Sequence, residues 1–342
     1  MNENNFIFEL EEALKGLPAE ERNDILKDIR EYFSDGREDG KEDEEIAASL
    51  GSPNVIAAEL LDAYPFDSRE VVNDSSHQVQ TIKNDSFSNV DINVHHGSLH
   101  LSLSETTDTI IKLNGQPEKH TLTAEVIGDT LEIKLKNKST WSFMFNFSMK
   151  AVHLDVCIPK KLYQSINMKS NNGKIYGEKL IAKRISSQSD NGRILLTEIA
   201  SSNLHAETDN GRIELVKVQA DQLKAKTDNG RILMNYIESD TIHAESDNGR
   251  IELDQVNGDI TATTDNGRIL LNTETLDQNI DFKTANGSIE INSSQMPLNA
   301  AISAKSGHGR IDIFGENNSL SKFGDATHQI KLKSSNGKIS VR

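Results

Sequence analysis

A five-residue phrase, Asp-Asn-Gly-Arg-Ile, occurs five times in the middle of this 342-residue chain. The glycines of the five copies are spaced by 19, 19, 19 and 18 residues; they are Gly192, Gly211, Gly230, Gly249 and Gly267. Looser copies flank them at Asn172–Ile175, Asn286–Ile289, Gly309–Ile311 and Asn336–Ile339. A period this short is typical of stacked units that bury their apolar faces only against one another. Because a repeat makes the same surroundings many times, it favours an extended surface over a single catalytic centre.

One repeat shows the alternation of a half-buried strand. The residues expected to point inward are Leu204, Ala206, Thr208, Asn210, Ile213 and Leu215, and those expected outward are His205, Glu207, Asp209, Arg212 and Glu214. We expect Gly211 to supply an unusual φ at the corner between two strands. Hydrophobic residues make up 35% and aromatic residues 5% of the chain, which suits a narrow core of Ile, Leu, Val and Ala.

Two architectures fit this repeat. Asn-Gly is a strong hairpin signal, so each repeat could be one hairpin of a long meander. Such a meander would form an open sheet of well over ten strands, a size that sheets rarely reach without curling or splitting. We therefore favour a mainly β fold, a right-handed β-helix over residues 81–342, with divergent rungs over 81–165 and regular rungs over 166–342. This β-helix would stack Asn191, Asn210, Asn229, Asn248 and Asn266 into one amide ladder.

Residues 1–65 are expected to form a separate all-α domain, joined to the β-helix by a polar linker over 66–80. Apolar residues recur at helical spacing, and Ser52-Pro53 has the N-cap and N1 residues of a helix start. Another helix is expected over Asp43–Leu50, with Gly51 at its end. About −14 of the chain's net charge of −16 falls within residues 1–76, which argues against nucleic acid as a partner of this domain.

The N-terminal segment resembles the HAAS-type domain, "heavily associated with anti-sigma", over about residues 5–63. The shared motifs are Phe8-Glu9-Leu10-Glu11, Leu17-Pro18, Glu31-Tyr32-Phe33, Asp35-Gly36 and Leu50-Gly51-Ser52-Pro53. In that family the domain usually precedes transmembrane helices or an envelope-stress module. The resemblance implies a bacterial protein whose N-terminal helices bind a protein partner.

Residues 80–342 resemble the putative-adhesin β-strand-repeat domains of unknown function that many bacteria contain. The resemblance rests on the Asn-Gly-Lys/Arg-Ile copies and on the entry segment Val152–Pro159. Some relatives are encoded in cell-envelope stress operons. The resemblance therefore implies an envelope-associated role without naming an activity.

The arginines of the repeat form one candidate binding ladder: Arg193, Arg212, Arg231, Arg250 and Arg268. The matching aspartates should stack beside them and screen their mutual repulsion. A neutralised structural corner is one interpretation, and we favour it because exposed ion pairs are common and weak. A row of guanidinium groups that binds the carboxylates or phosphates of a polymer is the other.

A doubled period runs through the outward positions. The residue after each repeat isoleucine alternates between leucine and glutamate: Leu195, Glu214, Leu233, Glu252, Leu270 and Glu290. Lys226 should likewise lie between Glu207 and Glu245 of the adjacent rungs. Duplication of a two-rung unit would explain this pattern, but so would a partner-binding face on which Leu195, Leu233 and Leu270 provide apolar contacts.

Aromatic residues gather on one face of an alternating run that contains Trp141, Phe143 and Phe145. A buried strand that caps the solenoid is the more common use of such a run. An exposed aromatic edge that binds a partner or a membrane surface is the alternative.

No segment of the sequence has the pattern of a catalytic, metal or cofactor site. The chain lacks a nucleophile elbow, a P-loop and a dinucleotide fingerprint, and His95-His96 has no metal-ligand partners nearby in sequence. Without a signal peptide or an apolar run of membrane-spanning length, the expected location is the cytoplasm, with peripheral membrane association as an option.

The sequence thus predicts a non-catalytic interaction or regulatory protein of the envelope stress response, with a protein as its partner. An adhesin-type surface protein that binds an envelope polymer is the second hypothesis. A polysaccharide-active β-helix enzyme is the third and least favoured.

Overall fold

The computed structural model describes two compact units, one of helices and one of strands. It covers residues 1–16, 42–63, 77–83, 86–115, 120–137 and 152–342, with residues 22, 25–26, 29–30, 33, 37 and 117 between them. Of the expected linker over 66–80, residues 66–76 lie outside this described part. Residues 77–80 belong to the first strand, β1 (His77–Ile82).

Three described helices form the N-terminal unit: α1 (Glu3–Ala13), α3 (Asp43–Leu50) and α4 (Pro53–Ala63). The side chain of Asn2 caps α1 by accepting a hydrogen bond from the Asn5 amide. Gly51 ends α3 with φ 88°, and α4 begins at Pro53, so the predicted helix signals at Gly51 and Ser52-Pro53 are confirmed. The core of this unit consists of Phe6, Ile7, Leu10, Leu14, Leu26, Phe33, Ile46, Ala47 and Ala57.

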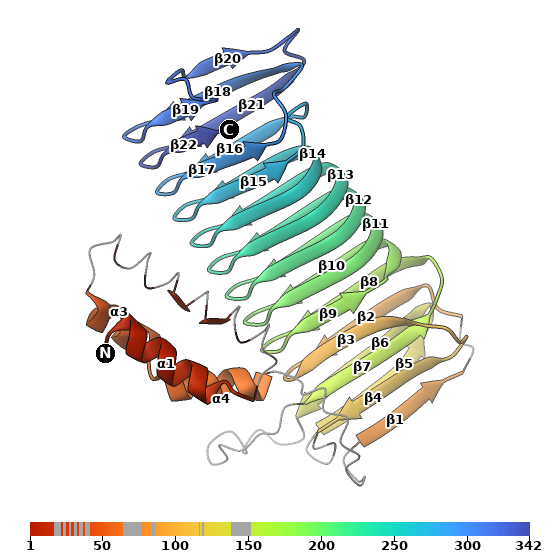
Figure 1. The fold of residues 1–342 in the computed structure, drawn as a ribbon. Coiled ribbons are helices and arrows are strands. Elements are labelled where there is room, and N and C mark those ends of the chain that lie inside the picture. The colour runs from red at the N-terminus through yellow and green to blue at the C-terminus, as the bar shows by residue number, and fades with distance from the viewer. Residues whose placement is uncertain are drawn as a thin grey trace. The chain divides into compact units, whose positions relative to one another are not determined.

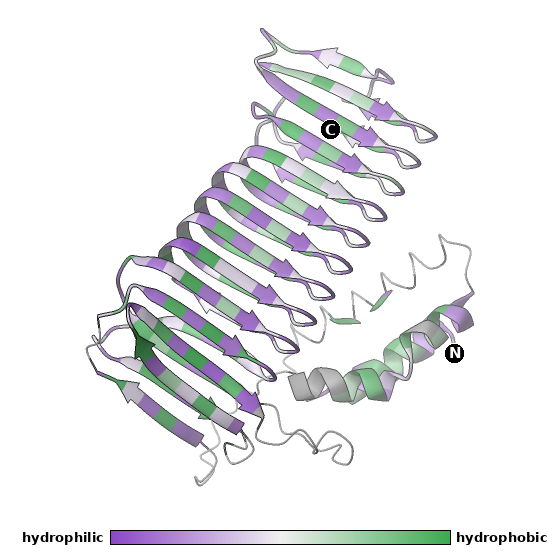
Figure 2. Ribbon diagram, turned by 180° about the vertical axis from the view of Figure 1, so that it is seen from behind, coloured by the Kyte–Doolittle hydropathy of each residue, from purple (hydrophilic) through white to green (hydrophobic). Residues whose placement is uncertain are grey.

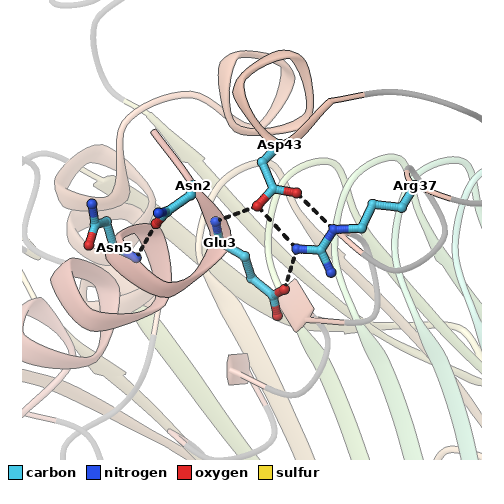
Figure 3. Close-up of polar contacts among 5 residues, drawn as sticks. All are labelled: Asn2, Glu3, Asn5, Arg37 and Asp43. Carbon is cyan, nitrogen blue, oxygen red and sulfur yellow. Dashed lines mark hydrogen bonds and ion pairs between the residues drawn. The ribbon is translucent and has the colours of Figure 1, made fainter.

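Arg37 joins the first turns of α1 and α3 (Figure 3). Its guanidinium donates to Glu3 Oε2 at 2.6 Å and to Asp43 Oδ1 at 2.7 Å. Asp43 Oδ2 also accepts the backbone N–H of Glu3 at 3.0 Å. The hydrogen bonds from Arg37 and from the Glu3 amide hold the pKa of the Asp43 carboxyl below its usual value. Two helix starts therefore depend on one exposed ion cluster.

Four long strands form the regular part of the solenoid: β11 (Ile194–Thr208), β12 (Ile213–Thr227), β13 (Ile232–Ser246) and β14 (Ile251–Thr264). They pair in parallel and in register, so that Ile194, Ile213 and Ile232 lie side by side (Figure 1). Parallel neighbours one repeat apart exclude the hairpin meander and confirm the β-helix. The single 18-residue step is absorbed by a register shift between Glu238 and Thr241.

Each rung has a short arm and a long arm, separated by a bend. In β11 the short arm is Ile194–Thr197, and the chain then turns at Glu198 with φ 57°. Equivalent residues in the other rungs also have φ between 52° and 57°; they are Lys179, Lys217, Tyr236 and Gln255. Buried and exposed residues alternate along both arms, as the hydropathy colours of Figure 2 show. The inward side chains of both arms join one apolar core.

The glycine column at the corners has a different cause from the one we expected. Gly211 does not have positive φ, so the predicted unusual φ is wrong. A Cβ built on Gly211 would instead lie 2.0 Å from the carbonyl oxygen of Gly192 in the previous rung. The same conflict, at 1.7–2.0 Å, occurs along the whole column: Gly192, Gly230, Gly249, Gly267, Gly287 and Gly337. Glycine is required here because the backbones of successive rungs approach too closely for any side chain.

The corners are held together by two ladders of side-chain hydrogen bonds. Asn210 Nδ2 donates to Asn191 Oδ1 at 2.8 Å, and this contact repeats at 2.7–2.9 Å from Asn172 through Asn336, which confirms the amide ladder. These asparagines are exposed, so the predicted inward direction of Asn210 is wrong. Inside the corner, buried Thr208 accepts the Gly211 N–H and donates to the Gly192 carbonyl.

The C-terminal end of the solenoid departs from sequence order. Its strands are β15 (Ile269–Thr273), β16 (Ile280–Thr284), β17 (Ile289–Ser293), β18 (Ala300–Ser306), β19 (Ile311–Ile313), β20 (Leu320–Lys322), β21 (His328–Ser334) and β22 (Ile339–Val341). The last rung of the chain inserts one place in from the end: β21 lies between β16 and β18, and β22 between β17 and β19. Antiparallel β20 then covers the edge of β18.

The N-terminal end uses the same device. Its strands are β1, β2 (Asn89–Val94), β3 (Ser98–Ser104), β4 (Thr109–Asn114), β5 (His120–Ile127), β6 (Thr130–Asn137), β7 (His153–Pro159), β8 (Tyr163–Ser170), β9 (Ile175–Glu178) and β10 (Ile181–Ser189). Here β2 lies between β6 and β8, and β3 between β7 and β9. Antiparallel pairs of β4 with β7, β1 with β4 and β5 with β6 cap this end. The region expected to hold only divergent rungs therefore mixes stacked rungs with antiparallel strands.

Candidate functional site

The outward side chains of the short arms form one continuous surface, which we call the short-arm face. The predicted leucine–glutamate alternation lies on it as a single column, because Leu195 is paired with Glu214 and Glu214 with Leu233. The column continues in register through Glu252, Leu270 and Glu290. The three leucines are half-buried rather than fully exposed. At roughly 4.8 Å per rung, successive leucines stand about 10 Å apart with a carboxylate between them.

The arginine ladder borders this column on the same face, since Arg193 and Leu195 are two residues apart on one strand. The structure stacks Arg193, Arg212, Arg231, Arg250 and Arg268 as predicted, each carbonyl of the later copies accepting the isoleucine N–H of the previous rung. Glu214 forms ion pairs with both Arg193 and Arg212, the latter at 3.2 Å. A glutamate of the neighbouring column thus supplies the screening that was expected from the corner aspartates.

This arrangement makes a two-rung unit of surface chemistry. Arg193, Arg212 and Glu214 are only 13–28% exposed at their side chains, so their charged groups are partly withdrawn from water. A carboxylate held between two guanidinium groups is satisfied and has little reason to bind a further cation. The half-buried leucine beside it is the part of the unit left to contact another surface.

Sequence reasoning missed an aromatic residue that extends the face toward the N-terminal end. Tyr176 is paired with Leu195 in register, and its ring lies 4.7 Å from the ring of His100. Burial and the neighbouring Glu178, whose Oε2 accepts the Tyr176 hydroxyl at 3.2 Å, raise the pKa of Tyr176. His100 also lies 3.4 Å from Asp155. Because this copy begins Lys-Ile-Tyr instead of Arg-Ile-Leu, the repeat alignment alone could have indicated it.

The long arms carry the second predicted ladder. Lys226 is paired in register with Glu207 on one side and Glu245 on the other, as the sequence predicts. Its ammonium group lies 3.7 Å from Glu245. His205 and His243 contact the same two glutamates within their own strands, at 3.1 and 3.2 Å.

The aromatic run could not be placed. Trp141, Phe143 and Phe145 lie outside the described residues, so their use as a cap or a binding edge stays a prediction. Within the described ranges, no group of three or more His, Cys, Asp or Glu side chains is arranged to hold a metal ion. None of the described helices is both long enough and apolar enough to cross a membrane.

Comparisons with known proteins match both units to families. A family model described as Toastrack DUF4097 matches residues 87–342, and one described as HAAS matches residues 5–59. None of the curated proteins searched matches the chain.

Several solved structures resemble the chain at low identity. A structure titled "putative adhesin" from Bacteroides fragilis is 14% identical, covers 79% of this chain and 98% of its own, and has a TM-score of 0.42. One with the same description from Parabacteroides merdae is 11% identical, covers 78% and 96%, and has a TM-score of 0.49. A structure titled "Putative lipid binding protein" from Parabacteroides distasonis is 13% identical, covers 78% and 97%, and has a TM-score of 0.38.

Proposed function

Because the chain belongs to the Toastrack DUF4097 family over residues 87–342, we propose that its solenoid is a non-catalytic scaffold that binds another protein along the short-arm face. The observation that supports this most strongly is the leucine of every second rung, held half-exposed between arginine–glutamate pairs. Neither family description names a catalytic activity.

The rigidity of the solenoid explains why such a face could be specific. Each rung is tied to its neighbours by strand pairing, the Asn ladder and the buried corner hydroxyls, so the spacing between leucines is fixed before a partner arrives. A pre-organised surface loses little conformational entropy on binding. The partner would need apolar side chains about 10 Å apart, two rungs of the solenoid. A regular spacing of this kind selects a partner with its own repeated or extended surface.

We propose further that the helical unit links this scaffold to the cell-envelope stress response. The support is the HAAS match at residues 5–59, in a family named for its association with anti-sigma proteins. The cytoplasmic location stays an expectation. Cell fractionation separates this proposal from the surface-adhesin hypothesis, since an adhesin would appear in the surface-exposed fraction and a regulator of this kind would not.

The proposal predicts that Leu195→Glu, Leu233→Glu and Leu270→Glu together abolish partner capture without unfolding the solenoid. Outward substitutions of this kind usually change stability by no more than about 0.5 kcal/mol each, whereas three new carboxylates would be desolvated against an apolar partner surface. Pull-downs from the native cells, quantified by mass spectrometry, would measure the loss. Circular dichroism would check that the strands are intact.

A matched control carries three new charges at outward positions elsewhere: Gln188→Glu, Gln219→Glu and Thr263→Glu. It should capture the same proteins as the unchanged chain. The proposal fails if the leucine variant retains all its partners, or if the control loses the same ones.

A further inference from the structure

The long-arm face holds a hollow that the proposed protein-binding face does not use. Its volume is about 480 Å³, and it runs across the rungs from Ser165 to His243. The residues that line it come from the outward positions of β8, β10, β11, β12 and β13. Every residue between 165 and 243 is described, so the chemistry of the hollow is fully defined.

The charge of this hollow is opposite to that of the chain. The chain has 53 Asp and Glu residues against 37 Lys and Arg, yet no Asp or Glu lines the hollow. Its ionisable lining residues are all basic: Arg184, His205, Lys224 and His243. They occur one per rung in four consecutive rungs, because β10 to β13 are stacked in register. The basic groups therefore follow the solenoid axis at intervals of roughly 4.8 Å.

The acidic residues nearest the hollow are already paired. Glu207 and Glu245 lie two residues beyond His205 and His243 on the same strands, and each contacts the Nε2 of its histidine. Lys226 adds a further cation beside Glu245, at 3.7 Å. The carboxylates at the rim are thus balanced locally, and Arg184 and Lys224 remain inside the hollow as exposed cations.

The other lining residues are neutral hydrogen-bonding groups. Asn203 Nδ2 donates to Gln222 Oε1 at 2.9 Å, so a row of side-chain amides runs beside the basic row. Amides and hydroxyls are suited to sugar hydroxyl groups, and cations at a regular spacing are suited to a polymer with regularly spaced acidic groups. We propose that this hollow binds a strand of a linear acidic polysaccharide along the solenoid axis.

Two other polyanions fit the observations less well. Single-stranded nucleic acid is normally held by aromatic side chains on which bases stack, and no Phe, Tyr or Trp lines the hollow. An acidic peptide in extended form usually adds to an open strand edge. Here both edges of β11 and β12 are occupied by neighbouring rungs.

The test is a calorimetric titration of the full chain with polygalacturonate, which carries one carboxylate per sugar. Neutral galactan, poly-L-glutamate and a single-stranded oligonucleotide provide the comparison ligands. Polygalacturonate should bind, galactan should not, and the other two anions should bind more weakly. Failure of polygalacturonate to bind, or tighter binding of the oligonucleotide or of polyglutamate, would overturn the assignment.

Variants locate the binding on the molecule. The double variant R184Q/K224Q should weaken polygalacturonate binding about tenfold, because it removes two charge-assisted contacts. H205Q/H243Q provides a second variant should the first perturb folding. The control K305Q/K331Q removes the same charge from the long arms of the C-terminal rungs and should bind within about twofold of the unchanged chain. Equal weakening in the control would show non-specific attraction and contradict the proposal. Since the leucine face is not altered, this outcome is independent of the protein-binding proposal.

Discussion

At the scale of single residues, the repeat is fixed by contacts between rungs rather than by turn conformation. Gly211 faces the backbone of the rung before it, and a Cβ there would lie 2.0 Å from the Gly192 carbonyl oxygen. Gly128, at the turn between β5 and β6, shows the opposite situation. It has φ 61° and nothing within 4 Å of its Cβ position. One glycine is needed for space and the other for conformation.

Substitution by alanine and asparagine should separate these two roles. Gly211→Ala and Gly211→Asn should each destabilise the solenoid by about 1–3 kcal/mol, the usual cost of overpacking. Gly128→Asn should cost less than about 1 kcal/mol, because asparagine tolerates positive φ and meets no obstacle. Urea unfolding followed by circular dichroism measures the difference. Tolerance of asparagine at position 211 would contradict the close-approach explanation.

Residues also show where sequence reasoning stops. The Asn ladder and the inward Leu204, Ala206 and Thr208 follow from alternation and period, and the structure confirms them. The column of positive φ had no such signal. It is occupied by residues as different as Lys217, Tyr236 and Gln255, because the bend depends on the backbone path and leaves the side chain exposed.

At the scale of elements, the order of the rungs could not be predicted from the repeat. The copy at Asn336–Ile339 has the same letters as the others, yet Gly337 stacks on Gly287, and Gly309 stacks on Gly337. Each terminal rung is inserted one place inward, and antiparallel strands cover the ends. Capping of this kind protects open strand edges from pairing with other chains.

Removal of residues 328–342 tests this arrangement. The truncation deletes β21 and β22, including the buried Ile330, Leu332, Ile339 and Val341. It leaves β16 and β17 without partners on one side and detaches β18 and β19 from the stack. We expect proteolysis or hydrogen exchange over residues 294–327 to increase strongly while residues 175–273 stay protected. Unchanged protection of β18 would contradict the inserted order.

The helical unit gives a prediction of pH dependence. The pKa of Asp43 is lowered by its hydrogen bonds from Arg37 and the Glu3 amide, so the cluster is fully stabilising above the ordinary value of 3.8. This stabilisation is lost as the pH falls further, through the lowered pKa of the folded state. Exchange at the start of α1, corrected for intrinsic rates, should rise in that acidic range.

Asp43→Asn should make the exchange of α1 faster at neutral pH and remove this part of its acid dependence. Glu9→Gln, on the exposed side of α1, is the control and should keep the acid response. An identical acid response in the Asp43 variant would show that the cluster does not hold the two helices.

At the scale of the whole molecule, scaffold and recognition are separated by position within the repeat. Asparagine, glycine, threonine and isoleucine build the corner and core in every copy. The outward positions vary, and on the short-arm face they alternate with a two-rung period. The sequence predicted this leucine column, and the structure shows that it is continuous, bordered by paired arginines and extended by Tyr176.

The most direct test of this account is photo-cross-linking in the native cells, with a photoreactive amino acid at single outward positions. Positions 195 and 233 should form cross-links to the same protein partner, and position 214, between two arginines, should do so less efficiently. Positions 188 and 263 on the long arms should form none to that partner. Equal cross-linking from both faces, or none from positions 195 and 233, would contradict the claim that the short-arm face is the binding surface.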